Sequence, residues 1–329
     1  MEEFKFTIEQ LEVVAEKVYE FMRPTPQYNW PLLSSRVGSE VWVKHENHGP
    51  TGAFKVRGGV VYVDELLKRY PETLEVIAAT RGNHGQSVAC AASRRGLKST
   101  IVVPIGNSVD KNMAMKSQGA EVITYGSDFQ EALEYARELG TIKNMHMFPS
   151  FDPILVQGVG TYAWEFFTAV SDLDTVYVPI GLGSGICGVI AVRDALCLNT
   201  KVVGVVAKSA PTYALSYKNK KVTPSASADT IADGLACRTP VDEALAIIIK
   251  SVERIVEVSD SEIKQAMAHY FTDTHNIAEG AGAAGLAALL AERNKIRGKR
   301  VGIILSGGNV DSSLYQSILQ CDNKWEENK

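Results

Sequence analysis

The sequence predicts an α/β protein with two domains, each built on an open, mostly parallel, twisted sheet with helices on both faces. Apolar, β-branched segments bounded by Gly and Pro alternate with helical patterns along most of the chain, which is the rhythm of βαβ units. The chain has 329 residues, and single hydrophobic cores stop growing at about 250–300 residues. We therefore expect two domains, with the active site in the cleft between them.

The expected elements follow one another from the N-terminus. A capping box at residues 7–10 starts a helix, which Leu11, Val14 and Val18 continue at helical spacing. A second helical pattern covers residues 60–67. Further helices lie between the strands, and the predicted strands are residues 41–44, 76–79, 100–103, 121–124, 176–178, 202–206, 255–258 and 301–305.

Composition argues against several classes of protein. The chain is 45% hydrophobic and 22% charged, with a formal net charge of −4, which is typical of a globular protein that binds neither nucleic acid nor membrane. No apolar run approaches the length that spans a bilayer. The five cysteines are scattered, and no Cys/His cluster has the spacing of metal ligands. We expect no bound metal and, since the N-terminus does not resemble a signal peptide, a cytoplasmic protein.

The stretch 51–59, Thr-Gly-Ala-Phe-Lys-Val-Arg-Gly-Gly, places Lys55 among glycines where a helix would begin. Little side-chain bulk surrounds this lysine, so another molecule could approach the backbone closely. A desolvated lysine at a helix N-terminus loses basicity, and a neutral amine can attack a carbonyl group. The alternative is a surface lysine in a glycine-rich loop.

A second candidate site follows the strand 76–79. The loop Thr80-Arg81-Gly82-Asn83-His84-Gly85-Gln86 leads into a helix expected from about Ser87. In parallel sheets, ligands bind beyond the carboxyl ends of the strands, and backbone N–H groups at a helix N-terminus suit a carboxylate or a phosphate. The alternative is a plain turn.

The glycine-rich loop 181–188 follows the strand 176–178 and has two interpretations. Its segment 183–188 matches G-x-G-x-x-G, the fingerprint of dinucleotide binding. That interpretation needs an acid at the end of the next strand, but Ala207 and Lys208 stand there. A phosphate cradle for a mononucleotide-like group is favoured, and an NAD-dependent oxidoreductase remains the alternative from another class.

Two further positions lie near the C-terminus. Ser306 ends the last predicted strand, where its hydroxyl could hydrogen-bond a ring nitrogen or belong to a plain turn. Glu279 precedes a helix of small residues, where it could be only a first-turn acid. Asp233, within 230–234, is expected to shape a turn.

Together these motifs resemble the fold-type II pyridoxal-phosphate enzymes, the tryptophan synthase β-like superfamily. Within it they resemble the threonine/serine dehydratase and serine racemase branch. The matching stretches occur in the family's order between about residues 24 and 313, and they are 44–47, 51–58, 82–86, 179–188, 230–236 and 306–309.

The resemblance implies a role for each motif. Lys55 would carry the cofactor covalently and move the Cα proton, while Phe54 packs against the cofactor and Asn83 hydrogen-bonds its phenolic oxygen. Ser306 would meet the pyridine nitrogen, and Glu279 would lie near the pocket. The phosphate would be bound by Gly181, Leu182, Gly183, Ser184 and Gly185. The substrate carboxylate would be bound by the loop Thr80, Arg81, Gly82, Asn83 and His84.

The resemblance also implies an activity. A hydroxyl such as that of Ser306 cannot keep the pyridine nitrogen protonated, which favours elimination of a β-hydroxyl over transamination. We expect dehydration of L-threonine first and L-serine second, giving a 2-oxo acid and ammonia. Hydroxyaspartate dehydratase, serine racemase and a β-replacement enzyme are the alternatives within the superfamily. The larger, phosphate-binding domain would comprise residues 1–50 and 151–329, the smaller one would comprise 51–150, and the enzyme would be a homodimer or higher homo-oligomer.

Among the departures of the chain from the family pattern, two concern the choice of reaction and the binding of a cation. Racemases of this branch use a serine where Arg81 stands, and arginine is never deprotonated in proteins, so it cannot act as the matching base. The Arg81 head group either pairs with an acid on the surface or enters the pocket and favours a substrate with a second carboxylate. Residues 207–213 lack the acids that hold a cation in the racemases.

Overall fold

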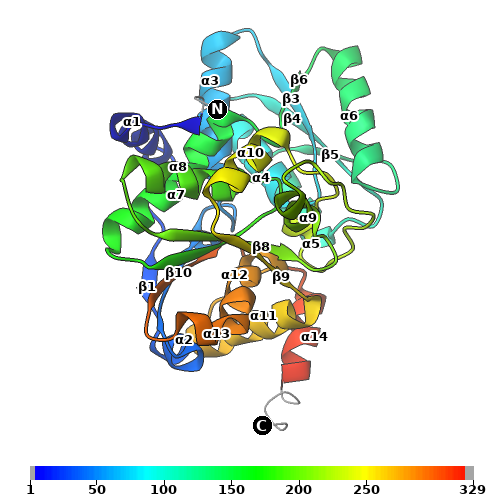
Figure 1. Cartoon of the computed structure of the whole chain (residues 1–329). Coiled ribbons are helices and arrows are strands. Elements are labelled where there is room, and N and C mark those ends of the chain that lie inside the picture. The colour runs from blue at the N-terminus through cyan, green and yellow to red at the C-terminus, as the bar shows by residue number, and fades with distance from the viewer. Residues whose placement is uncertain (1–3, 323–329) are drawn as a thin grey trace.

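The computed structural model describes residues 4–322, and these form two sheets (Figure 1). The larger sheet has six strands and the smaller has four, and every neighbouring pair is parallel except β1 with β2. The larger sheet runs in the order β1 (Gln27–Asn29), β2 (Glu40–His45), β10 (Arg300–Leu305), β7 (Thr175–Pro179), β8 (Lys201–Ala207), β9 (Arg254–Val258). The smaller sheet runs in the order β5 (Glu121–Thr124), β4 (Lys98–Val103), β3 (Glu75–Ala79), β6 (His146–Met147).

Helices connect the strands and cover both sheets. They are α1 (Ile8–Tyr19), α2 (Pro31–Val37), α3 (Lys55–Arg69), α4 (Asn83–Arg94), α5 (Val109–Ser117), α6 (Phe129–Lys143), α7 (Pro153–Ala169), α8 (Ser184–Ala195), α9 (Thr212–Asn219), α10 (Asp242–Ser251), α11 (Asp260–Thr274), α12 (Gly280–Ala291), α13 (Arg293–Ile296) and α14 (Ser312–Asp322). Two short 3₁₀ helices, η2 (Glu46–His48) and η3 (Asp233–Leu235), lie in the loops. None of the helices in the described part is long and apolar enough to cross a membrane.

The larger sheet is buried on both faces because side chains alternate along each strand. In β7, Val176 and Val178 pack with residues of α7 and α8, whereas Tyr177 packs with residues of α11 and α12. In β10, Ile303 and Ile304 divide between the same two cores. Such strands are apolar at nearly every position, which is why the sequence signals them so clearly.

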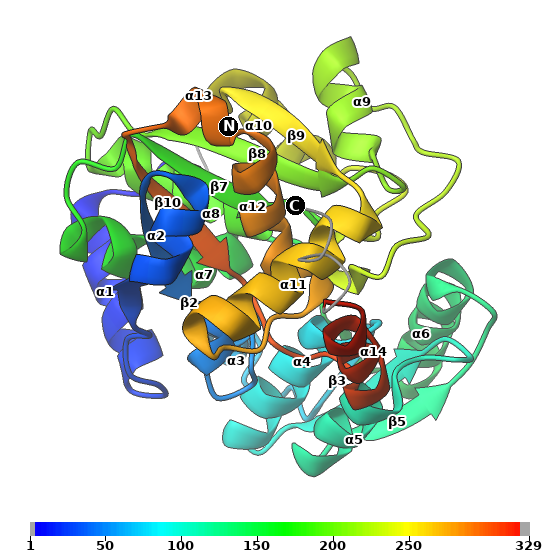
Figure 2. The ribbon, with the colours of Figure 1, turned by 90° about the horizontal axis from the view of Figure 1, so that it is seen from below.

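The smaller sheet is also covered on both faces. Ile77 of β3 packs with Ala132 and Ala136 of α6, while its neighbours Val76 and Ala78 pack with residues of α3 and α4. Figures 1 and 2 show this sheet with α5 and α6 as a lobe beside the larger sheet. The predicted fold class is confirmed in its parallel sheets with helices on both faces.

Each sheet has a point where the strand order reverses, and these points face the same region. In the larger sheet, the reversal lies between β10 and β7. Strands β8 and β9 follow β7 on one side, and β10 and β2 lie on the other. In the smaller sheet, β3 lies beside β6, with β4 and β5 on the other side. Ligands of open α/β sheets bind beyond the carboxyl ends of strands at such reversals.

The structure corrects one predicted helix start and adds two short strands. Helix α4 begins at Asn83 rather than near Ser87, so the motif 82–86 is itself the first turn of the helix. Helix α3 begins at Lys55, where the sequence predicted that a helix would begin, and it includes the pattern 60–67. Strands β1 and β6 were not predicted, because three and two residues are too short to show an alternating pattern.

Candidate active site

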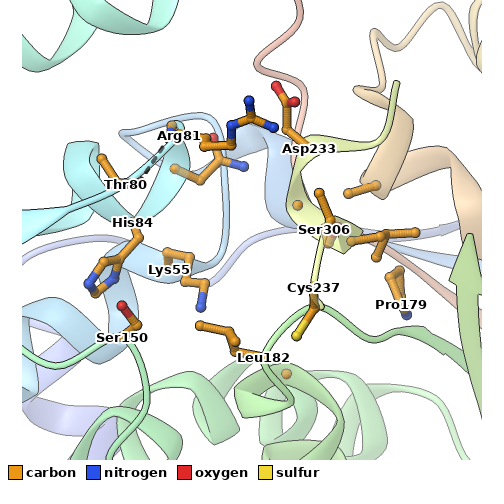
Figure 3. A pocket seen from close by; sticks show the side chains of 18 of the residues that line it. Lys55, Thr80, Arg81, His84, Ser150, Pro179, Leu182, Asp233, Cys237 and Ser306 are labelled. Atoms are coloured by element: carbon orange, nitrogen blue, oxygen red, sulfur yellow. Dashed lines mark hydrogen bonds between the residues drawn. The ribbon is translucent and has the colours of Figure 1, made fainter. Parts of the chain in front are cut away.

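One pocket collects every residue that the sequence indicated for a cofactor or a substrate (Figure 3). It lies where loops after β3, β7 and β10 meet the start of α3, which is the place that the two strand reversals predict. The predicted residues that line it are Phe54, Lys55, Thr80, Arg81, Gly82, Asn83, His84, Gly181, Leu182, Gly183, Ser184, Gly185, Glu279 and Ser306.

Lys55 is the first residue of α3. Two backbone hydrogen bonds hold the segment just before it against the end of β10. The Phe54 N–H donates to the Ser306 carbonyl at 3.1 Å, and the Gly308 N–H donates to the Gly52 carbonyl at 2.9 Å. The Lys55 side chain reaches into the pocket, where Nζ donates to Ser184 Oγ at 3.2 Å. Burial lowers the pKa of Lys55 to about 8. A substantial fraction of this amine is therefore neutral near physiological pH, as the sequence predicted.

Gly58 and Gly59 leave room for neighbouring helices. The sequence analysis instead interpreted them as leaving room for another molecule. A Cβ atom on Gly58 would lie 2.7 Å from the Leu155 carbonyl oxygen, and one on Gly59 would collide with Ser87 Oγ. These glycines let α3 pack closely on α7 and α4 and so fix the helix that begins with Lys55.

The loop 181–185 places the N-terminus of α8 at the pocket. Gly183 adopts φ = +103°, a conformation that favours glycine, and a Cβ atom on Gly181 would collide with the Gly234 carbonyl oxygen. The first N–H groups of a helix have no acceptor within it, and no side chain caps α8. These N–H groups and the positive end of the helix dipole suit a phosphate.

The N-terminus of α4 lies at the same pocket. Thr80 Oγ1 accepts hydrogen bonds from the N–H groups of Gly82 at 3.0 Å and Gly85 at 3.3 Å, which shapes the turn. No side chain caps this helix either. His84 Nε2 is buried and has no hydrogen-bond partner among the described residues, and burial lowers the pKa of His84 to about 3. A neutral His84 in the first turn of α4 is thus available to a ligand.

Ser306 lies at the end of β10 with its side chain toward the same pocket (Figure 3). The residue is buried, yet within residues 4–322 its hydroxyl oxygen takes part in no hydrogen bond. The hydroxyl oxygen is thus open to a hydrogen bond with a ligand group in the pocket.

Among the pocket residues that were not assigned from the sequence, four have a polar or reactive side chain. Lys111 and Cys237 line it, as does Ser150 just beyond β6, a strand that the sequence did not reveal. Asp233 does begin a turn of 3₁₀ helix, as expected, but it also lies 3.0 Å from Lys111 Nζ. Lys111 lies in the segment after β4, so the rule that ligands bind beyond the carboxyl ends of parallel strands, applied to residues 100–103, would have found it.

Arg81 extends from the loop 80–84, here called the substrate loop, toward the side of the pocket where Asp233 lies (Figure 3). It is exposed, and it forms no ion pair with any residue in the described part of the chain. The surface pairing that one interpretation required is absent, and the guanidinium group is available to a ligand.

Comparisons with known proteins cover most of the chain. The model of the family described as "Pyridoxal-phosphate dependent enzyme" matches residues 18–307. The biosynthetic L-threonine dehydratase of Haemophilus influenzae is 34% identical over 301 residues, which make up 91% of this chain. The chain spans 58% of the length of that relative.

Two further comparisons cover almost the whole length of both chains. The L-threo-3-hydroxyaspartate ammonia-lyase of Saccharomyces cerevisiae is 30% identical over 307 residues, 93% of this chain and 94% of the relative. The solved structure of the processed form of threonine deaminase isoform 2 from Solanum lycopersicum has a TM-score of 0.87 and 29% identity, covering 96% of this chain and 94% of that chain. From the family match and these relatives together, the chain belongs to the family of pyridoxal-phosphate-dependent enzymes.

Proposed function

We propose that the protein eliminates water from a β-hydroxy amino acid, L-threonine first and L-serine second, and that hydrolysis of the resulting enamine then releases ammonia and a 2-oxo acid. One observation carries this proposal. The amine of Lys55, whose pKa is lowered to about 8, lies in one pocket with two uncapped helix N-termini and the unpartnered hydroxyl of Ser306. This set suits a cofactor with an aldehyde, a phosphate and a ring nitrogen, and a substrate with a carboxylate.

The residues present fit pyridoxal phosphate. Lys55 supplies an amine for its aldehyde, the α8 N-terminus supplies N–H groups for its phosphate, and Ser306 supplies a hydroxyl for its ring nitrogen. The Phe54 ring lies beside Gly185 of the phosphate loop, with a Cβ at Gly185 placed 3.6 Å from Phe54 Cζ. When bound, pyridoxal phosphate withdraws electrons from Cα of an amino acid.

The chain's own residues account for the remaining requirements. The N–H groups at the start of α4, shaped by Thr80, would hold the substrate carboxylate, and the neutral His84 lies among them. Lys55 in its neutral form would accept the proton from Cα. Ser306 cannot supply a formal negative charge to the ring nitrogen, which favours loss of the β-hydroxyl over transfer of the amino group.

A 2-oxo acid assay tests the proposal directly. Purified protein supplied with pyridoxal phosphate should release a 2-oxo acid and ammonia in equal amounts from L-threonine and L-serine, and Lys55→Ala should release neither. L-Alanine lacks a β-hydroxyl and serves as the substrate control. If no β-hydroxy amino acid yields a 2-oxo acid while the cofactor is bound, the proposed reaction is wrong.

Two alternatives find less support in the residues. Dinucleotide binding at 183–188 needs an acid at the end of the next strand, but β8 ends at Ala207 and Lys208 follows it. Racemisation needs a base opposite Lys55, and Arg81 cannot act as one. Chiral chromatography that detects D-serine formed from L-serine would contradict this reasoning.

Arg81 favours a second candidate substrate, 3-hydroxyaspartate. Its guanidinium group lines the pocket without an ion-pair partner among the described residues, and a guanidinium binds a carboxylate through two parallel hydrogen bonds. One relative that matches this chain over nearly its full length is named as an L-threo-3-hydroxyaspartate ammonia-lyase.

The organisation of the protein completes the proposal. The larger sheet takes its strands from within residues 1–50 and 151–329 and the smaller from within 51–150, which supports the expected division into two domains. A cytoplasmic location is supported by the five cysteines, all of which are free. A homodimer or higher homo-oligomer is supported by large exposed apolar side chains such as Leu32 and Ile277, and light scattering would measure its size.

A further inference from the structure

A network of polar side chains joins the two sides of the pocket. Lys111 Nζ lies 3.0 Å from Asp233 Oδ2 and 3.8 Å from Glu279 Oε2. Asn83 Nδ2 donates to Glu279 Oε1 at 2.6 Å, and Asn309 Nδ2 donates to Asn83 Oδ1 at 2.8 Å. Lys111 and Asn83 belong to helices beside the smaller sheet, whereas the other three residues lie in loops of the larger one. The network therefore connects the two lobes at the substrate loop.

The hydrogen bonds fix the direction of the Asn83 amide. Asn309 Nδ2 also donates to the backbone carbonyl of Thr51 at 2.8 Å, and a carbonyl oxygen only accepts. This sets the nitrogen of Asn309 toward Asn83, so Asn83 presents its oxygen there and its nitrogen to Glu279. An amide nitrogen carries two hydrogens, so Asn83 keeps one N–H for a ligand in the pocket.

Because Glu279 and Lys111 are buried, the contacts of the network depend on the charges of these two side chains. Glu279 is only 5% exposed and Lys111 only 7%. Burial raises the pKa of Glu279, while Lys111 and the hydrogen bond from Asn83 act against that rise. Desolvation disfavours the charge on Lys111, but Glu279 and Asp233 outweigh it and raise the pKa of Lys111. If Glu279 were protonated, it could donate as well as accept, and the contact with Asn309 alone would fix the direction of the Asn83 amide.

Three glycines from three separate motifs make room for this network. A Cβ atom added to any of them would come too close to a network side chain for the present packing to persist. The pairs are Gly82 with Lys111 Cδ at 2.7 Å, Gly307 with Glu279 Oε1 at 2.5 Å and Gly52 with Asn309 Oδ1 at 2.5 Å. All three glycines thus leave space for the side chains of the network. The sequence did not indicate this role.

We propose that Lys111, Glu279 and Asn309 are positioning residues that hold the Asn83 amide with an N–H donor toward the cofactor. Such a donor suits an anionic oxygen on the ligand, such as the ring oxygen of pyridoxal phosphate. Lys111 acts through Glu279, and Asp233 helps to hold Lys111 in place. The proposal concerns cofactor binding and does not depend on which amino acid is the substrate.

Two substitutions of Glu279 separate positioning from packing. Glu279→Gln keeps an oxygen acceptor for Asn83, whereas Glu279→Met removes it at similar volume. The readouts are the affinity of the apo-protein for pyridoxal phosphate and the absorption spectrum of the holoenzyme, with thermal unfolding as the check on folding. Glu279→Met should weaken cofactor affinity about tenfold and shift the visible band, while Glu279→Gln stays within about threefold of wild type. Equal behaviour of the two variants would overturn the proposal.

Substitution of Lys111 tests the coupling between the charges. Lys111→Met leaves Glu279 buried without its cation, so cofactor affinity should fall about tenfold. Adding Glu279→Gln removes the unpaired charge, so the double variant should regain most of the affinity. A double variant as weak as Lys111→Met would overturn the coupling. Lys116→Met, on the exposed face of α5, is the matched control and should match wild type. If Lys111→Met does not fold, the two Glu279 variants decide the proposal alone.

Discussion

Lys55 Nζ donates to Ser184 Oγ at 3.2 Å, so the first residue of α3 meets the first residue of α8. The amine therefore lies close to the N-terminus of the helix that is suited to a phosphate. The positive ends of two helix dipoles lie near this amine, and both disfavour an additional positive charge. Desolvation acts in the same direction and lowers the pKa of Lys55.

Lys55 should be the residue that carries the cofactor. Borohydride reduction of the holoenzyme followed by peptide mass spectrometry should find the pyridoxyl group on Lys55, and Lys55→Ala should bind no cofactor covalently and show no turnover. Lys111 is the other lysine among the residues that line the pocket, and Asp233 and Glu279 hold it charged. A label on Lys111 would refute the assignment.

The lowered pKa of Lys55 predicts a pH dependence of the apo-protein. A lysine in an unfolded chain titrates at about 10.4, whereas Lys55 in the folded protein titrates at about 8. Between these values the unfolded state binds more protons, so the free energy of unfolding rises with pH. Below pH 8 both states hold the proton, and the cost of burying the charge is present in full.

Urea unfolding of the apo-protein at several pH values from about 7.5 to 9.5 checks this sign. The free energy of unfolding of wild type, minus that of Lys55→Met, should increase with pH across this range. Lys116→Met should show no such trend relative to wild type. A difference that stays constant or falls with rising pH would contradict the lowered pKa of Lys55.

The sequence predicted the pocket better than the network inside it. Lys55, Asn83 and Ser306 each follow or end a clear apolar strand, so local pattern and the rule for parallel sheets bring them together. Lys111 follows a predicted strand, but its contact with Asp233 arises only through the fold, and Asp233 alone has the features of an ordinary turn residue. The glycines at 58 and 59 were misinterpreted because sequence cannot distinguish space left for a ligand from space left for a helix.

Local sequence pattern also did not predict a buried ion network around Arg57 of α3. Arg57 Nε lies 2.7 Å from Glu46 Oε2, and Arg57 Nη1 lies 2.6 Å from Glu165 Oε1. Lys44 Nζ lies 2.6 Å from Glu165 Oε2. Arg57, Glu46 and Lys44 are fully buried, and they come from segments whose contacts local pattern does not reveal.

Loss of Arg57 should therefore destabilise the fold strongly. Arg57→Met leaves Glu46 and Glu165 buried with too little positive charge, and breaking such a network costs about 3–5 kcal/mol of unfolding free energy. The matched control is Arg95→Met, which breaks the more exposed pair with Asp64 and should cost at most about 1 kcal/mol. Urea unfolding measures both. Similar losses in the two variants would mean that the buried network does not set the stability of α3.

Arg81 should decide whether the enzyme prefers a substrate with one carboxylate or two. The comparison needs kcat/KM for L-threonine and L-threo-3-hydroxyaspartate in wild type, Arg81→Ala and Arg81→Lys. If the guanidinium binds the second carboxylate through two hydrogen bonds, its removal should cost the diacid about 1.5–3 kcal/mol, roughly ten- to a hundredfold in kcat/KM. L-Threonine has a methyl group at that position, so its kcat/KM should change little.

Arg81→Lys refines the interpretation, because lysine keeps the charge but not the planar pair of donors. It should recover only part of the loss for the diacid. Binding of two unreactive acids gives a readout without turnover, since L-malate and 3-hydroxybutyrate correspond to the two substrates without the amino group. Arg81→Ala should weaken the binding of L-malate and leave that of 3-hydroxybutyrate unchanged. Equal losses for both members of either pair would mean that Arg81 shapes the loop 80–84 instead of selecting the substrate, and L-threonine would then stand as the preferred substrate.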